Sequence, residues 1–172
     1  LEHWHSLIRP EVEGTEAYWR DLSGRMSAAR LTFGDRPLCP FLRPFFLDAA
    51  DQARVRTVAE TIAAVGERVV QAAMADPGLL HQVRLTEAET RLTRIEPGYG
   101  RASTSSRLDA FILPGSLKFA EYNAESPAGL AYAENLAEVF DGLELMQRFR
   151  EQYETQFYQL STAILDALLE SY

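Results

Sequence analysis

Four polar side chains at alternating positions of two short apolar segments are the residues of this chain best suited to chemistry. Arg107 and Asp109 alternate in RLDAFIL, and Glu121 and Asn123 alternate in LKFAEYN. Alternate residues of a β-strand lie on the same face, so each segment offers two polar groups on one side. Polar groups among leucine, isoleucine and phenylalanine are costly to bury unless a partner satisfies them. A magnesium ion with bound nucleotide phosphates would satisfy all four.

The loop between the two segments decides whether these side chains meet. Pro114-Gly115-Ser116 is a strong turn signal for a β-hairpin. Directly opposed residues of an antiparallel pair share one face, and a slip of one residue moves a whole strand's side chains to the other face. A three-residue loop would place Leu113 opposite Leu117 and Phe111 opposite Phe119.

The same three-residue loop would place Asp109 opposite Glu121 and Arg107 opposite Asn123. A two-residue loop of proline and glycine would instead place Asp109 opposite Ala120 and scatter the four polar groups. We therefore predict the three-residue loop, because it gathers the polar groups on one face.

Oxygen ligands dominate this group of side chains. Asp109, Glu121 and the amide oxygen of Asn123 are hard ligands of the kind that Mg²⁺ and Mn²⁺ prefer. Two neighbouring carboxylates repel each other unless a cation or a proton lies between them. Arg107 is placed to hold a phosphate oxygen bidentately. The alternative is a salt bridge from Arg107 to Asp109 or Glu121 on a solvated sheet face, with no ligand involved.

The pattern R-x-D, followed by E-Y-N-A-E-S-P with twelve positions from the aspartate to the glutamate, resembles a segment of glutathionylspermidine synthase and related ATP-grasp ligases. In those ligases this segment binds magnesium and phosphate, with R-x-D on one strand and E-x-N-A-D-[ST]-P on the next. The resemblance implies that Asp109, Glu121 and Asn123 are magnesium ligands. It also implies that Arg107 stabilises the transferring phosphoryl group and that Ser126 lies near the acid substrate.

The function implied by this resemblance is that of an ATP- and Mg²⁺- (or Mn²⁺-) dependent carboxylate–amine ligase. Such a ligase phosphorylates a small carboxylate substrate, and an amine then displaces the phosphate to form an amide. The chain departs from the family pattern at Glu125, where an aspartate is common, and at Ala128-Gly129, where Thr-Ser is common. Both changes lie outside the residues assigned to the metal.

A second lobe with a nucleotide-gripping lysine is not evident in this sequence. Lys118 is its single lysine, and in the predicted register it points to the face opposite the site residues. We therefore expect the chain to be a single domain, 1–172, excised from a longer ATP-grasp-type protein. The missing parts would lie C-terminal to Tyr172, and the isolated chain would be inactive.

Length and composition limit the classes of function. The 172 residues are 47% hydrophobic and 24% charged, which is typical of one soluble globular core. A net charge of −8 argues against nucleic acid or an anionic membrane as a partner, and no apolar run is long enough to span a bilayer. Cys39 is the single cysteine, which excludes an internal disulfide and indicates a reducing cytoplasm.

The strongest helix prediction runs from a cap at Asp48 to about Ala75, and Asp76-Pro77-Gly78 ends it. Its apolar stripe recurs every three or four residues and consists of Val55, Val58, Ile62, Val65, Val69 and Ala72. We expect this stripe to face the sheet, and a dimer seam is the alternative.

Shorter helices are predicted on both sides of the hairpin. They cover 14–30, the stretch from a Thr86 capping box to about Arg94, the stretch from Ser126 to about Phe140, and regions near 143–152 and 154–172. Ser126 would be the N-cap and Pro127 the first helical residue, so that this helix N-terminus would favour an anion close to Asn123. The proline-rich segment 31–47 is expected to be extended, and His3-Trp4-His5 to be an exposed terminus.

These elements predict an α+β fold. A small antiparallel sheet built on the central hairpin would be packed by the long helix and the C-terminal helices, as part of an ATP-grasp-like domain. The second functional hypothesis is a non-catalytic helical interaction or dimerisation module that keeps a degenerate site. The Val/Ala stripe and the acidic surface support this second hypothesis.

Overall fold

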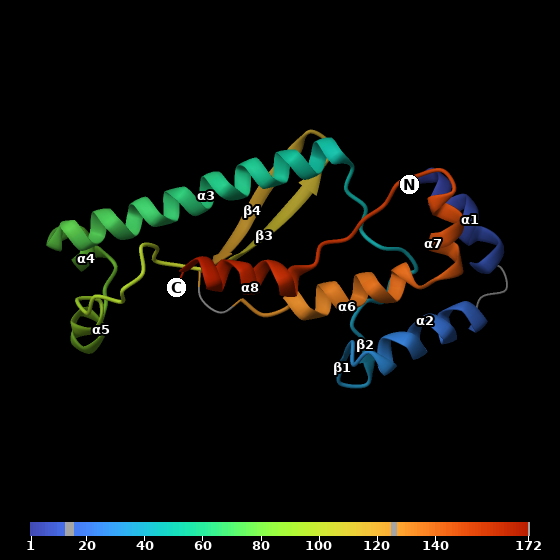
Figure 1. Cartoon of the computed structure of the whole chain (residues 1–172), viewed down its shortest axis with the longest axis horizontal. Coiled ribbons are helices and arrows are strands. Elements are labelled where there is room, and N and C mark those ends of the chain that lie inside the picture. Colours follow the sequence, from blue (N-terminus) through green and yellow to red (C-terminus); the bar gives the residue numbers. More distant parts are fainter. Residues whose placement is uncertain (13–15, 125–126, 172) are drawn as a thin grey trace. The chain divides into compact units, whose positions relative to one another are not determined.

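The computed structural model describes residues 1–12, 16–124 and 127–171 (Figure 1). Helices and two-stranded antiparallel sheets make up the described chain, which confirms the α+β prediction. In chain order the elements are α1 (Glu2–Val12), α2 (Glu16–Ala28), β1 (Thr32–Phe33), β2 (Arg36–Pro37), α3 (Ala49–Ala75), α4 (Pro77–Gln82), α5 (Glu87–Leu92), β3 (Arg107–Leu113), β4 (Ser116–Asn123), α6 (Leu130–Asp141), α7 (Glu144–Arg150) and α8 (Leu160–Ser171). Among these helices, none combines the length and the apolar character needed to cross a membrane.

The chain divides into two compact units. The first comprises Leu1–Phe46 and Gly129–Ala163, and the second comprises Leu47–Ala128 and Ile164–Tyr172. The hairpin β3–β4 and the long helix α3 both belong to the second unit. That the whole chain is one domain of a longer protein stays a prediction.

The first unit contains nearly all of the buried apolar side chains of the described chain. Its helix α1 packs against α7, and α2 packs against α6. The fully buried side chains are Trp4, Leu22, Met26, Leu31 and Phe140. Truncating a buried tryptophan or phenylalanine to alanine costs roughly 3–5 kcal/mol, so this cluster dominates the stability of the first unit.

The amino-terminal segment corrects one expectation. Trp4 is completely buried, and its ring makes edge contacts with Phe46 and Phe149, at centroid distances of 5.4 and 5.5 Å. His3 stacks on Phe149 at 5.6 Å, whereas His5 is exposed. The segment is therefore part of the core rather than an exposed terminus. It forms an amphipathic helix, with Trp4 on the side that packs in the core and His5 on the side that faces solvent.

Segment 31–47 forms no helix, as its prolines predict, and its regular structure is limited to the short β1–β2 pair. Phe46 stacks on Phe149 at 4.9 Å and so ties the end of the segment to the core of the first unit. Phe41 and Phe45 remain exposed, so only part of the predicted aromatic anchoring is present.

In the second unit, the long helix has the predicted ends. Asp48 caps α3, with its Oδ1 atom accepting a hydrogen bond of 2.7 Å from the backbone N–H of Asp51. Asp76 ends α3 and caps α4, with Oδ1 accepting from the N–H of Gly78 at 2.7 Å. The predicted capping box at Thr86 is also present and opens α5.

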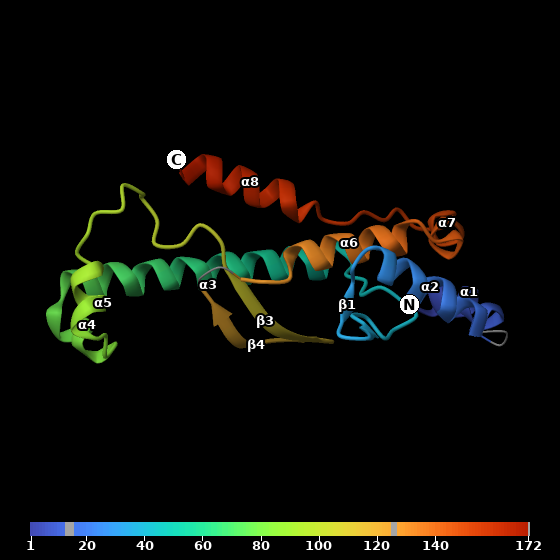
Figure 2. The same ribbon diagram turned by 90° about the horizontal axis from the view of Figure 1, so that it is seen from below.

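Only part of the predicted apolar stripe of α3 is covered. The half-buried members are Val55, Val58 and Ile62, whereas Val65 and Val69 are 53% and 59% exposed. At the hairpin, Gly66 lies against the ring of Tyr122 on β4. Figures 1 and 2 show β3 and β4 beside α3. The glycine allows an aromatic ring to approach the helix backbone closely, so the contact follows from residue size rather than from the spacing of the valines.

The helix after the hairpin begins later than predicted. Its N-cap is Gly129 at φ +106°, a conformation that favours glycine, and Pro127 precedes the helix. Ser126, the predicted N-cap and substrate-binding residue, lies outside the described residues. The helix predicted at 154–172 begins only at Leu160, and Tyr153 instead stacks on Phe149 at 4.8 Å.

The Gly66–Tyr122 contact gives a prediction about stability. A methyl group on Gly66 would lie 3.0 Å from Cε1 of Tyr122, so Gly66→Ala would gain helix propensity but force the ring to move. We expect Gly66→Ala to stabilise the chain by about 1 kcal/mol in a Tyr122→Ala background, and by clearly less in the wild type. Chemical denaturation followed by circular dichroism measures both differences.

Gly24 on α2 supplies the matched control, because an added methyl group there meets nothing within 4 Å. Gly24→Ala should stabilise by about 1 kcal/mol in either background. Equal effects of Gly66→Ala with and without the Tyr122 ring would show that the contact does not constrain the hairpin.

Candidate functional site

The hairpin turn is shorter than predicted. Leu113 pairs with Ser116, so the loop contains only Pro114 and Gly115. Proline fixes φ near −65° and Gly115 has φ +69°, the sequence of angles expected for a type II turn. The predicted three-residue loop is therefore wrong, as are the predicted pairs of Leu113 with Leu117 and of Phe111 with Phe119.

A β-bulge at Ala120 restores the pairing of the polar residues. Ala110 pairs with Phe119 and Asp109 pairs with Glu121, which leaves Ala120 without a partner on β3. Type II turns match the right-handed twist of paired strands poorly, and a bulge adds right-handed twist. The two-residue turn shifts the register by one residue, and the bulge shifts it back by one.

Asp109 therefore lies opposite Glu121 and Arg107 lies opposite Asn123, as predicted. All four side chains belong to the face of the hairpin opposite to the one that carries Tyr122, which contacts α3. The side chains of Arg107 and Asp109 are 41% and 43% exposed. The structure thus places the four predicted side chains together on an accessible face.

The four side chains form one hydrogen-bonded network. Arg107 donates from Nε to Oδ1 of Asp109 at 2.8 Å and from Nη1 to the backbone oxygen of Ala128 at 2.8 Å. With the amide of Asn123 oriented so that its nitrogen faces Glu121, Nδ2 donates to Oε1 of Glu121 at 2.9 Å. In this orientation the Asn123 oxygen accepts from Nη2 of Arg107 at 3.3 Å. Each carboxylate therefore has a donor beside it, which relieves the repulsion between the two negative charges.

The electrostatics of the network centre on Arg107. The hydrogen bond and the negative charge of Asp109 raise the pKa of the Arg107 guanidinium, and the charge of Glu121 acts in the same direction. A group with a raised pKa contributes stability that is lost only as the pH rises through its folded-state pKa. Because arginine already titrates in strong alkali, the ion pair does not depend on the ionisation of Arg107 at any ordinary pH.

Residues of α3 and of the segment before β3 hold the hairpin in place. The backbone N–H groups of Ala102 and Ser103 donate to Oε1 of Glu67 on α3 at 3.0 and 3.2 Å. The hydroxyl of Ser103 donates to the backbone oxygen of Ala124 at 2.8 Å, which joins the start of β3 to the end of β4. The sequence analysis did not single out Glu67, and no local pattern indicates a contact over 35 residues of chain.

The two-residue turn also changes the face on which Lys118 lies. Lys118 pairs with Phe111, which alternates with Asp109 along β3. Lys118 therefore belongs to the same face as the site residues, and its predicted orientation toward the opposite face is wrong. The Pro-Gly dipeptide is the signal that would have indicated this, because a two-residue loop pairs Phe111 with Lys118.

Carboxylate and amide oxygens are suitable ligands for Mg²⁺ or Mn²⁺, and Asp109, Glu121 and Asn123 supply both kinds. Among the described residues, no group of three or more His, Cys, Asp or Glu side chains is arranged to hold a metal ion. A cation here would rest on two carboxylates and one amide, completed by water or by ligand oxygens. This donor set fits an ion that is shared with a phosphate substrate.

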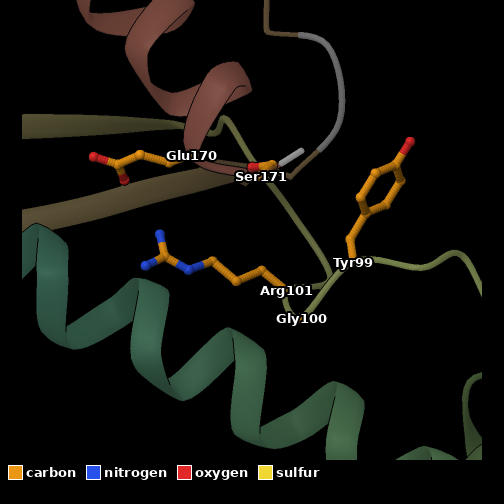
Figure 3. Close-up of a pocket in the computed structure, with 5 residues that line it drawn as sticks. All are labelled: Tyr99, Gly100, Arg101, Glu170 and Ser171. Atoms are coloured by element: carbon orange, nitrogen blue, oxygen red, sulfur yellow. The ribbon is translucent and has the colours of Figure 1, made fainter.

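A pocket of about 190 Å³ lies elsewhere in the second unit (Figure 3). Tyr99, Gly100 and Arg101 line it from the loop before β3, and Glu170 and Ser171 line it from the end of α8. Tyr99 points away from Arg101 and Glu170 in Figure 3. The volume is below the roughly 300 Å³ of ordinary ligand sites, and none of the predicted site residues lines the pocket.

Comparison of the chain with protein-family models, with curated proteins and with solved structures finds no match in any of the three.

The network predicts a test at Asn123. Asn123→Asp replaces the amide donor to Glu121 with a third negative charge, so we expect a loss of about 1 kcal/mol in unfolding free energy in EDTA. The same variant should gain more stability from Mn²⁺ than the wild type does, because a third carboxylate strengthens a cation site. Thermal unfolding with and without Mn²⁺ measures both effects.

Asn135→Asp is the matched control, since Asn135 is exposed on α6 in the other unit. It should change stability by less than about 0.5 kcal/mol and should not alter the response to Mn²⁺. If Asn123→Asp behaves in the same way as Asn135→Asp, the hydrogen bond to Glu121 has no energetic role.

Proposed function

We propose that the β3–β4 hairpin binds a divalent cation together with nucleotide phosphates. In this proposal the chain is part of a cytoplasmic, ATP- and Mg²⁺-dependent carboxylate–amine ligase of the ATP-grasp kind. One observation carries the proposal: a bulge at Ala120 places two carboxylates, one amide and one guanidinium on a single accessible face.

In this proposal the oxygen ligands bind the cation and the guanidinium binds the phosphoryl group. Asp109, Glu121 and the amide oxygen of Asn123 would hold Mg²⁺ or Mn²⁺, and Arg107 would stabilise negative charge on the transferring phosphoryl group. Without a cation, the amide nitrogen of Asn123 faces Glu121, and binding would require the amide to turn its oxygen toward the ion. Ser126 remains the proposed contact to the acid substrate.

Cation binding is the first test of this function. We expect millimolar Mn²⁺ to raise the melting temperature of the wild-type chain, because an ion that binds only the folded state stabilises it by mass action. A hundredfold excess over the dissociation constant corresponds to about 2.7 kcal/mol. The rise should be absent in Asp109→Asn/Glu121→Gln, measured by differential scanning fluorimetry.

The matched control is Asp35→Asn/Glu60→Gln, which removes the same two charges from exposed positions outside the hairpin. It should keep the full response to Mn²⁺. A wild-type melting curve indifferent to both Mn²⁺ and Mg²⁺, together with a clearly destabilised hairpin variant, would mean that the carboxylates serve only as partners of Arg107.

Turnover is the second test. Phosphoryl transfer needs cationic groups that bind all three phosphates of ATP, and Lys118 is the only lysine of the sequence. We therefore expect the chain 1–172 to release no phosphate from ATP above background with any acid and amine pair. Phosphate release that disappears in Arg107→Ala would contradict this expectation and would locate a complete active site in the chain.

A second candidate function is a helical interaction or dimerisation module. It is favoured by the second unit, in which Ala73 is the one buried hydrophobic residue among those described, while many large apolar side chains are exposed. On α3 these include Val65, Val69 and Met74. Sedimentation velocity separates the two functions, since self-association that Val65→Glu/Val69→Glu abolishes would favour the module.

A further inference from the structure

We propose that Lys118 is a second cationic contact for the phosphate chain of the nucleotide at the hairpin site. This inference rests on the proposed function, because it assigns a phosphate-binding role to a further residue of the same site. Lys118 pairs with Phe111 across the hairpin, and Phe111 is two residues from Asp109 on β3. Lys118 and Asp109 are therefore diagonal neighbours on one face, about 7–8 Å apart, within reach of a long side chain.

The two-residue turn is the reason for this position. It pairs Leu113 with Ser116 and therefore Phe111 with Lys118, which lies between the turn and the bulge. Without the bulge, Glu121 would lie on the face opposite to Lys118, because the two are three residues apart on β4. The turn thus brings the ammonium group, and the bulge brings the carboxylate of Glu121, to the face of Arg107.

Arg107 uses three of its five N–H donors within the protein, so a second cation would add to what it can offer a phosphate. Each of its three guanidinium nitrogens faces a protein acceptor, namely Asp109, the backbone oxygen of Ala128, and the oxygen of Asn123. Lys118 is exposed, and it belongs to no ion pair within the described part of the chain. A flexible, hydrated ammonium group with three donors suits a phosphate chain whose position changes during transfer.

The charges on this face also favour a phosphate ligand. Arg107 and Lys118 carry two positive charges, and Asp109 and Glu121 carry two negative charges, so the face is neutral without an ion. A bound divalent cation gives it an excess of two positive charges, which a polyphosphate can neutralise. Lys118 therefore supplies one of the two positive charges that remain after the carboxylates have bound the cation, and Arg107 supplies the other.

The test measures cation and phosphate binding separately on the full chain. Mn²⁺ binding is followed by electron paramagnetic resonance of the free ion, without phosphate. Inorganic tripolyphosphate saturated with Mg²⁺ is followed by ³¹P NMR. We expect Lys118→Met to weaken tripolyphosphate binding about tenfold, which corresponds to about 1.4 kcal/mol, without weakening Mn²⁺ binding. Lys118→Arg should retain most of the tripolyphosphate affinity.

Arg91→Met is the matched control, because Arg91 is exposed on α5 in the same unit and its loss removes an equal charge. It should leave tripolyphosphate binding unchanged, and all variants should melt at the wild-type temperature. The proposal is overturned if Lys118→Met binds tripolyphosphate as the wild type does, or if Arg91→Met weakens binding equally, while Mn²⁺ still binds. If wild-type chain binds neither Mn²⁺ nor tripolyphosphate, the proposed function fails together with this inference.

Discussion

The register of the β3–β4 hairpin is the constraint on which the candidate site depends. A shift of one residue in β4 would send Glu121 and Asn123 to the face that contacts α3, where polar groups would meet the helix. Pro114 and Gly115 impose a two-residue turn, and the unpaired Ala120 compensates for it. Turn and bulge therefore act as a pair, because neither alone places all four polar side chains on one face.

The polar network shows how such a face is kept stable without a ligand. Carboxylates that lie side by side would repel each other, but here a guanidinium and an amide lie between them in the order Asp109, Arg107, Asn123, Glu121. The long helix α3 positions the hairpin that carries this network. The carboxylate of Glu67 accepts a hydrogen bond from the backbone before β3, and Gly66 leaves space for the ring of Tyr122. A cation that entered the site would replace hydrogen bonds of this network with metal contacts. The side chains are therefore positioned without a ligand but can rearrange to bind one.

The two units are stabilised in different ways. The first has an aromatic and aliphatic core around Trp4 and Phe149, with several side chains completely buried. The second relies on helix caps, on backbone hydrogen bonds and on half-buried side chains, and it leaves apolar residues such as Phe111 and Leu113 exposed. Small apolar contact areas provide little stability, so the second unit should respond more strongly than the first to a bound ion or partner.

The sequence by itself determined the features that depend on neighbouring residues. Asp48 caps the long helix, Thr86 opens a capping box, and Pro114-Gly115 marks the hairpin turn, although not the length of its loop, because each acts on backbone groups within about four residues. Only the tertiary structure decided the bulge and the contact of Gly66 on α3 with Tyr122. These features depend on strand twist and on contacts between distant segments, for which a single sequence carries no local signal.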